Sequence, residues 1–368
     1  MRIELNNTKR IVIKIGSSII DHNHDKIING VCANILNLLD EGKEVILVTS
    51  GAISQGMKVM NIQTKPKDIK KLQSLAAIGQ QKLMLIYENI FSKSNLQTAQ
   101  ILITHGDIND RVHYLNIKGT LEELLDNNVI PIINENDVVS TEEIKLGDND
   151  NLASMIANCV SADLLIILTD QNGMYDKNPD SNRDAKLINK ISVEDLKDFD
   201  SDFSTQSEIG TGGFTTKVQA VKRAALSNTH TLIANGLEDN ILNNIFYEDD
   251  IGTLFIPSEK KVSAKKQWLD TTDNRNSVII DDGACKAISD NKSLLLVGVD
   301  DVEGSFEKGD VIQCKNKNLI CIAKGIVNYS SDEVLKIKGK SMDEVTTEFG
   351  SEFSRELIHV DNLIIIET

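Results

Sequence analysis

The sequence has few cysteines, and none of them lie in a spacing typical of a metal site. Five cysteines are dispersed over 368 residues, and no Cys-x-x-Cys pair occurs. An odd number of scattered cysteines argues against a disulfide framework and against a zinc site of that type. The pattern is typical of reduced thiols in a cytosol, so we expect a cytoplasmic protein.

Long apolar runs are also missing. No segment approaches the roughly 20 consecutive apolar residues that a membrane helix needs. The first ten residues, MRIELNNTKR, lack the apolar core of a signal peptide. We therefore expect neither a membrane span nor secretion.

Positive charge is in short supply. Lysine and arginine total 39 against 55 aspartates and glutamates, a formal net charge of −16. Such a balance argues against broad electrostatic binding of nucleic acid or of anionic membranes. A chain with 40% apolar and 26% charged residues is an ordinary globular protein, long enough for two domains and a substantial core.

The first two thirds of the sequence alternate between apolar runs and segments with helical spacing. Apolar runs, read as strands, occupy residues 11–15, 44–48, 99–103, 129–133, 163–168, 230–234 and 253–256. Helical spacing is found at about 25–39, 72–91, 114–125 and 151–160. Alternation of this kind predicts an α/β domain, doubly wound, with a mainly parallel sheet sandwiched by helices.

Several of the predicted strands end in turns whose residues could bind a ligand or take part in catalysis. Lys14 interrupts the first apolar run, and Gly16 follows it directly. An unpaired ammonium inside a buried strand is costly, so Lys14 either extends to the solvent or meets an anion. Residues 49–53 (TSGAI) form a second small-residue turn at a strand end.

Residues 131–151 carry two dense clusters of amides and carboxylates behind a predicted strand. The clusters are 134–137 (NEND) and 148–151 (DNDN). Each alone reads as an Asx turn on the surface. Two together, close behind one buried strand, favour a binding or catalytic site at the strand end.

A glycine-rich turn, 210–217 (GTGGFTTK), opens a predicted amphipathic helix. Free backbone N–H groups and the helix dipole suit a phosphate at such a place. The spacing is not that of a Walker A loop, and a simple tight turn is the alternative interpretation.

Beyond residue 257 the character of the chain changes. A lysine-rich stretch reads as a linker, and short apolar segments with frequent glycines follow it. These segments, read as strands, are 278–280, 293–297, 310–314, 319–325, 334–337 and 363–366. They predict a small C-terminal β-barrel with one or two short helices. From Arg275 onward 11 basic and 17 acidic residues give a net charge of −6.

The segments taken in order resemble the amino-acid kinase family. They are 14–18 (KIGSS), 49–53, 134–137, 147–151 (GDNDN), 169–170 (TD) and 210–217. The tail resembles a PUA domain through 281–284 (DDGA), 293–295 (SLL) and 359–362 (HVDN). The resemblance implies a kinase domain at 1–257, a linker at 258–274 and a PUA domain at 275–368.

Within the family, the resemblance is to the kinases of the glutamate side chain. It implies transfer of the γ-phosphoryl group of ATP to that carboxylate, which gives L-glutamyl 5-phosphate, the first step of proline biosynthesis from glutamate. A carboxylate is already ionised at neutral pH and needs no general base, so catalysis reduces to positioning and charge neutralisation. Lys14 and Lys217 would stabilise the moving phosphoryl group, and Asp150 would orient both lysines.

The resemblance also assigns the two substrate sites. Glutamate would be held by Ser50, Asn134, Asp137 and Asn149, with Asp137 on its ammonium group. The positions that match the ATP site are Lys14, Gly16, Thr169, Asp170, Thr211, Gly212, Gly213, Phe214, Thr215, Thr216 and Lys217. The backbone N–H groups of Gly16 and Gly51 would cradle phosphate, and Mg²⁺ would ride on the ATP phosphates without a dedicated protein site.

Partners follow from the same resemblance. We expect proline as a feedback inhibitor, a homo-oligomer, and a hand-off of the product to glutamyl phosphate reductase. The polar span 61–71 (NIQTKPKDIKK) is either a mobile lid over the glutamate site or a solvated connection. Two rivals remain: a kinase of the same superfamily acting on acetylglutamate, aspartate or UMP, and an RNA-binding protein. Leu296 and Val360 replace a proline and an arginine that are usual in these PUA domains, which argues against RNA.

Overall fold

The computed structural model describes most of the chain. The described residues are 5, 7–21, 24–140, 149–177, 179, 182–199, 214–247, 251–257, 269, 276–338 and 355–366. They divide between two compact units, Met1–Val262 and Ser263–Thr368. Each unit is described by itself.

An eight-stranded sheet forms the centre of the first unit. Its strands are β1 (Arg10–Ile15), β2 (Glu44–Thr49), β3 (Gln97–Ile103), β4 (Val129–Glu135), β5 (Leu164–Thr169), β6 (Lys190–Ser192), β7 (His230–Asn235) and β8 (Thr253–Ile256). Their order is β3-β4-β2-β1-β5-β7-β8-β6. Only β7 and β8 run antiparallel to each other, and all other neighbours are parallel. The predicted doubly wound, mainly parallel sheet is confirmed.

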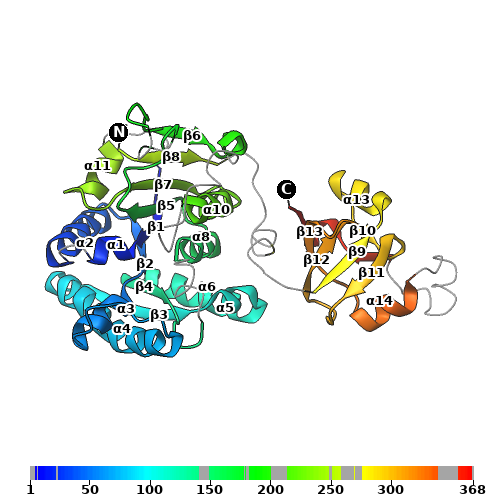
Figure 1. Ribbon diagram of the computed structural model, residues 1–368, viewed down its shortest axis with the longest axis horizontal. Helices are drawn as coiled ribbons and strands as arrows, with labels where there is room; N and C mark the ends of the chain where they lie inside the picture. Colours follow the sequence, from blue (N-terminus) through cyan, green and yellow to red (C-terminus); the bar gives the residue numbers. More distant parts are fainter. Residues whose placement is uncertain are drawn as a thin grey trace. The chain divides into compact units, whose positions relative to one another are not determined.

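Helices cover both faces of this sheet (Figure 1). One layer contains α1 (Ser17–Asp21), α2 (His24–Asp40), α3 (Ala52–Val59), α4 (Ile69–Phe91) and α11 (Ile241–Tyr247). The other contains α5 (His105–Asn109), α6 (Arg111–Asp126), α8 (Asn149–Cys159) and α10 (Phe214–Ala225). The described residues of this unit also contain two 3₁₀ helices, η2 (Ser92–Ser94) and η3 (Val193–Phe199).

The apolar runs of the sequence are continuous because the central strands are buried on both faces. Ile11, Ile13 and Ile15 of β1 face a core that also contains Tyr87 and Phe91 of α4. Val12, between them, is equally inaccessible. Every residue of β5 is buried as well. The strand centres are therefore packed with hydrocarbon, and the polar residues collect at the strand ends.

Helices α3 and α4 approach each other at two glycines. A Cβ atom built on Gly56 would lie 1.9 Å from the carbonyl oxygen of Leu75, and one on Gly79 would lie 1.8 Å from that of Ala52. Real Cβ atoms never come so close, so only glycine permits this backbone contact. The contact sets α4 directly against the turn that follows β2.

Two helix starts differ from the sequence prediction. Helix α4 begins at Ile69, inside the predicted loop 61–71, because the Asp68 side chain caps it by accepting a hydrogen bond from the Lys71 N–H, at 2.9 Å. Helix α8 begins at Asn149 rather than near Asn151. Its first turn therefore contains Asp150, where a carboxylate is favoured by the helix dipole.

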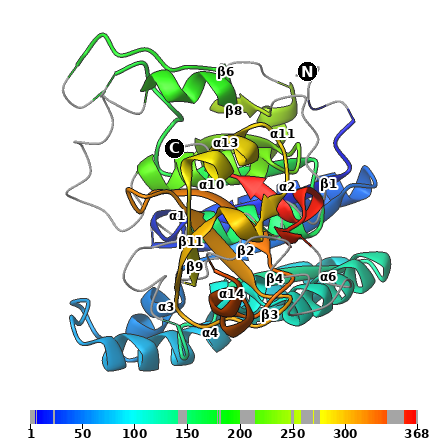
Figure 2. The ribbon, with the colours of Figure 1, turned by 90° about the vertical axis from the view of Figure 1, so that its right-hand side faces the viewer.

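The second unit is rich in strands, as predicted. Its strands are β9 (Ser277–Ile280), β10 (Leu294–Leu295), β11 (Val299–Glu303), β12 (Val311–Lys315), β13 (Cys321–Ile326), β14 (Glu356–Ile358) and β15 (Leu363–Ile365). A five-stranded sheet has the order β11-β9-β12-β13-β15, and β10 pairs with β14. The short helices are α13 (Asp282–Ser289), α14 (Ser331–Ile337), η4 (Leu296–Gly298) and η5 (Val360–Asn362). Figure 2 shows α13 and α14 toward opposite ends of β9 and β11.

One predicted strand of this unit is wrong. Residues 334–337 belong to helix α14, because a capping box starts a helix upstream of them. The Ser330 hydroxyl accepts from the Glu333 N–H, and the Glu333 carboxylate accepts from the Ser330 N–H.

In the described part of the chain, no helix has the length and apolarity that crossing a membrane requires.

Candidate active site

Four adjacent strands deliver their carboxyl ends to one edge of the first sheet. Strands β4, β2, β1 and β5 are consecutive in the sheet order and parallel. They are followed by four of the segments singled out in the sequence, at Asn136, Ser50, Gly16 and Asp170. Ligands of open parallel sheets bind at this edge, so these turns form the candidate active site.

A buried carboxylate joins the two lysines at this edge. Lys14 Nζ lies 2.6 Å from Asp150 Oδ1, and Lys217 Nζ lies 3.2 Å from Asp150 Oδ2. The Asp150 side chain is 1% exposed, and the lysine side chains are 8% and 12% exposed. Burial by itself would raise the pKa of Asp150, but the two ammonium groups hold it below its ordinary value.

The three residues come from different elements that the fold packs together. Lys14 lies on β1, Asp150 in the first turn of α8, and Lys217 in the first turn of α10. Helix α8 contacts both β1 and α10. Lys14 therefore does not extend to the solvent: the first of the two interpretations is wrong, and it meets an anionic partner.

Gly16 lies close to the ammonium group of Lys14, but its backbone N–H is already bonded within the protein. Its N–H donates to the Leu168 carbonyl oxygen at 3.1 Å, so the expected phosphate contact of that N–H is not available. A Cβ atom on Gly16 would lie 3.8 Å from Lys14 Nζ. Gly51 has a left-handed backbone with φ 95° and precedes α3, while its Cα faces Ile20 closely enough to exclude a side chain.

Buried amides connect the proposed glutamate residues. Asn149 Nδ2 donates to Ser50 Oγ at 3.0 Å and to Asn134 Oδ1 at 2.9 Å. The same nitrogen lies 2.9 Å from the Thr49 carbonyl oxygen. Ser50, Asn134 and Asn149 are 3%, 1% and 0% exposed. Three of the residues expected to hold glutamate are thus brought together in one hydrogen-bonded group.

Two residues that the sequence did not indicate extend this group. Asn134 Nδ2 donates to Gln80 Oε1 at 2.8 Å, and Thr49 Oγ1 lies 2.9 Å from the buried hydroxyl of Tyr87. Both partners belong to α4. Their helical spacing with apolar neighbours predicts only a core-facing helix, so no signal in the sequence marks them.

Asp137 lies near these amides and is 6% exposed. Burial, reinforced by the neighbouring Glu135, raises its pKa to about 7, while Lys65 acts in the opposite sense. Gln73 of α4 donates to the carbonyl oxygen of Asp137 at 3.1 Å, which ties this turn to the helix. No described hydrogen bond reaches Asp137 Oδ1.

Glu135 is the other carboxylate of this turn. Its side chain is fully buried, and its Oε2 atom lies 3.3 Å from Nδ1 of His105, the first residue of α5. The pair is ionic when the imidazole is protonated. It brings the start of α5 against the end of β4, next to Asp137.

The nucleotide side is only partly described. Thr169 ends β5 and donates its hydroxyl to Asp170 at 3.1 Å. Thr215 and Thr216 lie in the first turn of α10, the first of them exposed. Phe214 begins that helix. Thr211, Gly212 and Gly213 lie outside the described residues, so the predicted phosphate-binding turn stays a prediction.

Comparison with known proteins places this geometry in a class. The model of the amino acid kinase family matches residues 9–235, and that of the PUA domain matches residues 276–349. The first match spans more than half of the chain, and it contains both lysines and Asp150. The chain belongs to the amino acid kinase family and carries a PUA domain after it.

Similarity within that family extends over whole chains. The chain is 43% identical over 372 residues to a protein of Marinomonas sp. (strain MWYL1), with all of both chains covered. It is 45% identical over 364 residues to one of Thermoanaerobacter sp. (strain X514), covering 97% of this chain and 98% of the other. Both relatives are named glutamate 5-kinase. Among solved structures, carbamate kinase from Giardia lamblia bound to AMP-PNP is 18% identical, with a TM-score of 0.49 over 68% of this chain and 99% of that one.

Proposed function

We propose that this chain is a glutamate 5-kinase. It transfers the γ-phosphoryl group of ATP to the side-chain carboxylate of L-glutamate, which yields L-glutamyl 5-phosphate and ADP and begins proline biosynthesis. The observation that carries the proposal is the Lys14–Asp150–Lys217 group, buried beside the amides Asn134 and Asn149. Full-length similarity to relatives with that name supports it.

The proposed reaction is a direct displacement at phosphorus. A carboxylate oxygen of glutamate forms a bond to the γ-phosphorus while the bond from that phosphorus to the β,γ-bridging oxygen breaks, and the leaving ADP takes the electron pair. Because the carboxylate is already ionised, the site needs positioning and positive charge rather than a base. Lys14 and Lys217 supply that charge from opposite sides of Asp150.

Asp150 has an orienting role in this proposal. Its two oxygens are each within ion-pair distance of one lysine, so both ammonium groups are held at the same place before substrate arrives. Pre-organised charge stabilises a transition state without a reorganisation cost at the moment of reaction. We assign glutamate to Ser50, Asn134, Asp137 and Asn149, with its ammonium group on Asp137.

Mg²⁺ enters the proposal as a companion of ATP. The buried carboxylate closest to the phosphoryl position, Asp150, already has both oxygens taken by lysines. We therefore place the ion on the phosphate oxygens of ATP, where it would neutralise charge on the leaving group. Thr169, Asp170 and residues 211–217 are assigned to the nucleotide.

The proposal also covers the compartment, the regulation and the partners of the chain. All five cysteines are free thiols, which supports a reducing compartment such as the cytoplasm. From the similarity to glutamate 5-kinases, we also propose feedback inhibition by proline, a homo-oligomeric state and transfer of the product to glutamyl phosphate reductase. The negative charge of the chain argues against nucleic acid as a partner of the PUA domain.

One assay tests the proposed function. Hydroxylamine converts an acyl phosphate to a stable hydroxamate, so ATP, Mg²⁺, glutamate and hydroxylamine together should give glutamyl hydroxamate and an equal amount of ADP. Acetylglutamate, aspartate and UMP, tested in parallel with ADP release as the common readout, should give little turnover. A preference for any of these three over glutamate would overturn the proposal.

A further inference from the structure

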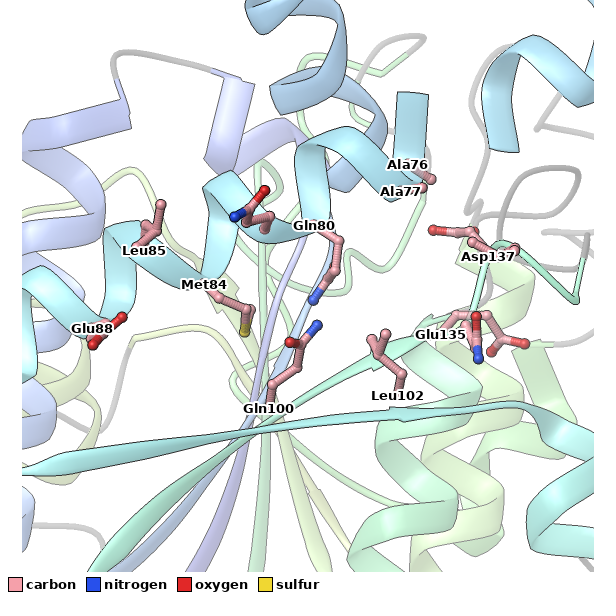
Figure 3. Close-up of a pocket in the computed structure, with 13 residues that line it drawn as sticks. Ala76, Ala77, Gln80, Met84, Leu85, Glu88, Gln100, Leu102, Glu135 and Asp137 are labelled. Carbon is pink, nitrogen blue, oxygen red and sulfur yellow. The ribbon is translucent and has the colours of Figure 1, made fainter. Parts of the chain in front are cut away.

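A groove adjoins the proposed glutamate site and shares Asp137 with it. It has a volume of about 430 Å³ and lies between α4 and the ends of β3 and β4. Figure 3 shows Gln80 and Met84 on one side, Gln100 and Leu102 on the other, and Asp137 and Glu135 toward one end. The groove therefore contains the carboxylate to which we assign the ammonium group of glutamate.

The orientation of the Gln80 amide follows from a backbone donor. The Glu135 N–H donates to the Asn134 side chain at 2.9 Å, and because an N–H can only donate, the atom that receives it is Asn134 Oδ1. The other end of the Asn134 amide is then Nδ2, which faces Gln80. Nδ2 also can only donate, so the Gln80 atom that meets it is the oxygen.

Gln80 consequently presents its nitrogen to the groove. The residue is 7% exposed, and its Nε2 has no hydrogen-bond partner among the described residues. In Figure 3 that nitrogen points into the space between α4 and β3. A buried donor without an acceptor is costly, so a ligand that brings an acceptor into the groove would be stabilised by this N–H.

The chemistry of the groove defines the ligand group. The carboxylates of Asp137 and Glu135 attract a cationic group of a ligand. They repel a carboxylate of the same ligand, so that carboxylate needs a hydrogen-bond donor in the groove. Gln80 Nε2 is such a donor. Because it carries no charge, it does not form an ion pair with Asp137 or Glu135, as a lysine at this place would. An α-amino acid carries both groups on one carbon.

We propose that Gln80 is a specificity-determining residue that donates its Nε2–H to the α-carboxylate of the substrate, beside Asp137 on the ammonium group. The inference rests on the proposed function. The hydrogen-bonded side chains of Asn149, Asn134 and Gln80 would then extend along the substrate. Asn149 would lie at the end where the side-chain carboxylate of glutamate reacts, and Gln80 at the end where its α-carboxylate binds. Helix α4 carries this selectivity, since its contact with α3 at Gly79 places Gln80 against Asn134.

The test compares glutamate with 4-aminobutyrate, which is glutamate without its α-carboxylate. Gln80→Glu keeps an acceptor for Asn134 and replaces the groove donor with a negative oxygen. At about pH 8.5, the KM for glutamate should rise by roughly thirtyfold to a hundredfold, as expected when a hydrogen bond to a charged group is lost. The Ki of 4-aminobutyrate as a competitor of glutamate should stay within about threefold of the wild-type value, because that molecule makes no contact with Gln80.

Two further variants separate recognition from structure. Gln80→Met removes donor and acceptor at similar length and should raise the KM for glutamate by a smaller factor than Gln80→Glu. The matched control is Asn89→Asp, which makes the same amide-to-carboxylate change on an exposed residue of α4 that does not line the groove, and it should leave both constants unchanged. The KM for ATP and thermal melting report on folding in each variant.

The outcomes are distinct. A parallel rise of the glutamate KM and the 4-aminobutyrate Ki would assign Gln80 only to support of Asn134, and would overturn the inference while leaving the proposed function in place. An unchanged KM for glutamate in Gln80→Glu would overturn it as well. A wild-type chain that does not phosphorylate glutamate would overturn the proposed function, and the inference with it.

Discussion

Asp150 holds the ammonium groups of Lys14 and Lys217 on its two separate oxygens, at 2.6 Å and 3.2 Å. The arrangement places two positive charges at one point in a nearly dry part of the protein. Asp150 offsets only one of them, so the group as a whole has a net positive charge. Such a group is suited to an anionic ligand, and the transferring phosphoryl group is the anion that we assign to it.

Removal of either lysine tests that assignment. Lys14→Ala and Lys217→Ala should each lower kcat by about a hundredfold or more, which corresponds to roughly 3 kcal/mol in the transition state, with a modest change in KM. Steady-state kinetics with glutamate and ATP provide the measurement. Lys222→Ala, in the last turn of α10, is the control and should keep its activity. Near-normal kcat in either variant would leave that lysine with a structural role alone.

Asp137 should make glutamate binding depend on pH. Its pKa is raised to about 7 by burial and by Glu135, and only the ionised form attracts the ammonium group. The value of kcat/KM for glutamate should therefore increase about tenfold per pH unit below 7 and level off above it. Asp137→Asn should remove this dependence and raise the KM for glutamate far more than that for ATP. A variant with the wild-type pH profile would move the titration to another group.

The same carboxyl group should weaken the fold at neutral pH. Its folded-state pKa is above the ordinary value, so the folded chain binds the proton more tightly than the unfolded chain does. The stability from this group is full below its ordinary pKa of 3.8 and is lost as the pH rises toward 7. In urea unfolding at about pH 8, without glutamate, Asp137→Asn should be more stable than wild type by up to about 4 kcal/mol. Equal stability at about pH 8, or a larger gain at about pH 5, would contradict the assignment.

Two glycine substitutions should have opposite effects on stability. Gly79→Ala places a methyl group 1.8 Å from the Ala52 carbonyl oxygen, so it should separate α3 from α4 and destabilise the chain by more than about 3 kcal/mol. Gly30→Ala, at an exposed position of α2 where a Cβ atom would meet nothing within 4 Å, should stabilise it by about 0.5–1 kcal/mol. Denaturant unfolding measures both. A mild effect of Gly79→Ala would show that α4 can shift without harm.

Proline inhibition provides a test of the connection between α3 and α4. Lys65, in the span interpreted as either a lid or a solvated connection, acts on the pKa of Asp137, so this connection lies within electrostatic reach of the amino-acid end of the site. Proline should compete with glutamate but not with ATP. Lys65→Ala should weaken the inhibition several-fold and leave kcat nearly unchanged. Inhibition that does not respond to glutamate concentration would place the effector elsewhere on the molecule.

By itself, the sequence determined the class of fold and indicated most of the residues of the candidate active site. Apolar runs alternate with helical spacing because parallel strands are buried on both faces and helices on one. Lys14 stands out since an ammonium in such a run requires a partner. The dense amide and carboxylate clusters near residues 134 and 150 stand out because a buried strand precedes them. These signals are local, and local patterns are visible in a sequence.

Only the tertiary structure decided which distant residues meet. Asp150 lies between Lys14 and Lys217 because α8 packs on both β1 and α10, a consequence of strand order and helix packing rather than of spacing. Gln80 reaches Asn134 because two helices touch at glycine, and nothing in its own segment distinguishes it from other polar residues of a helix. Hydrogen bonds between residues far apart in the chain depend on how whole layers dock, and that geometry exists only in the folded protein.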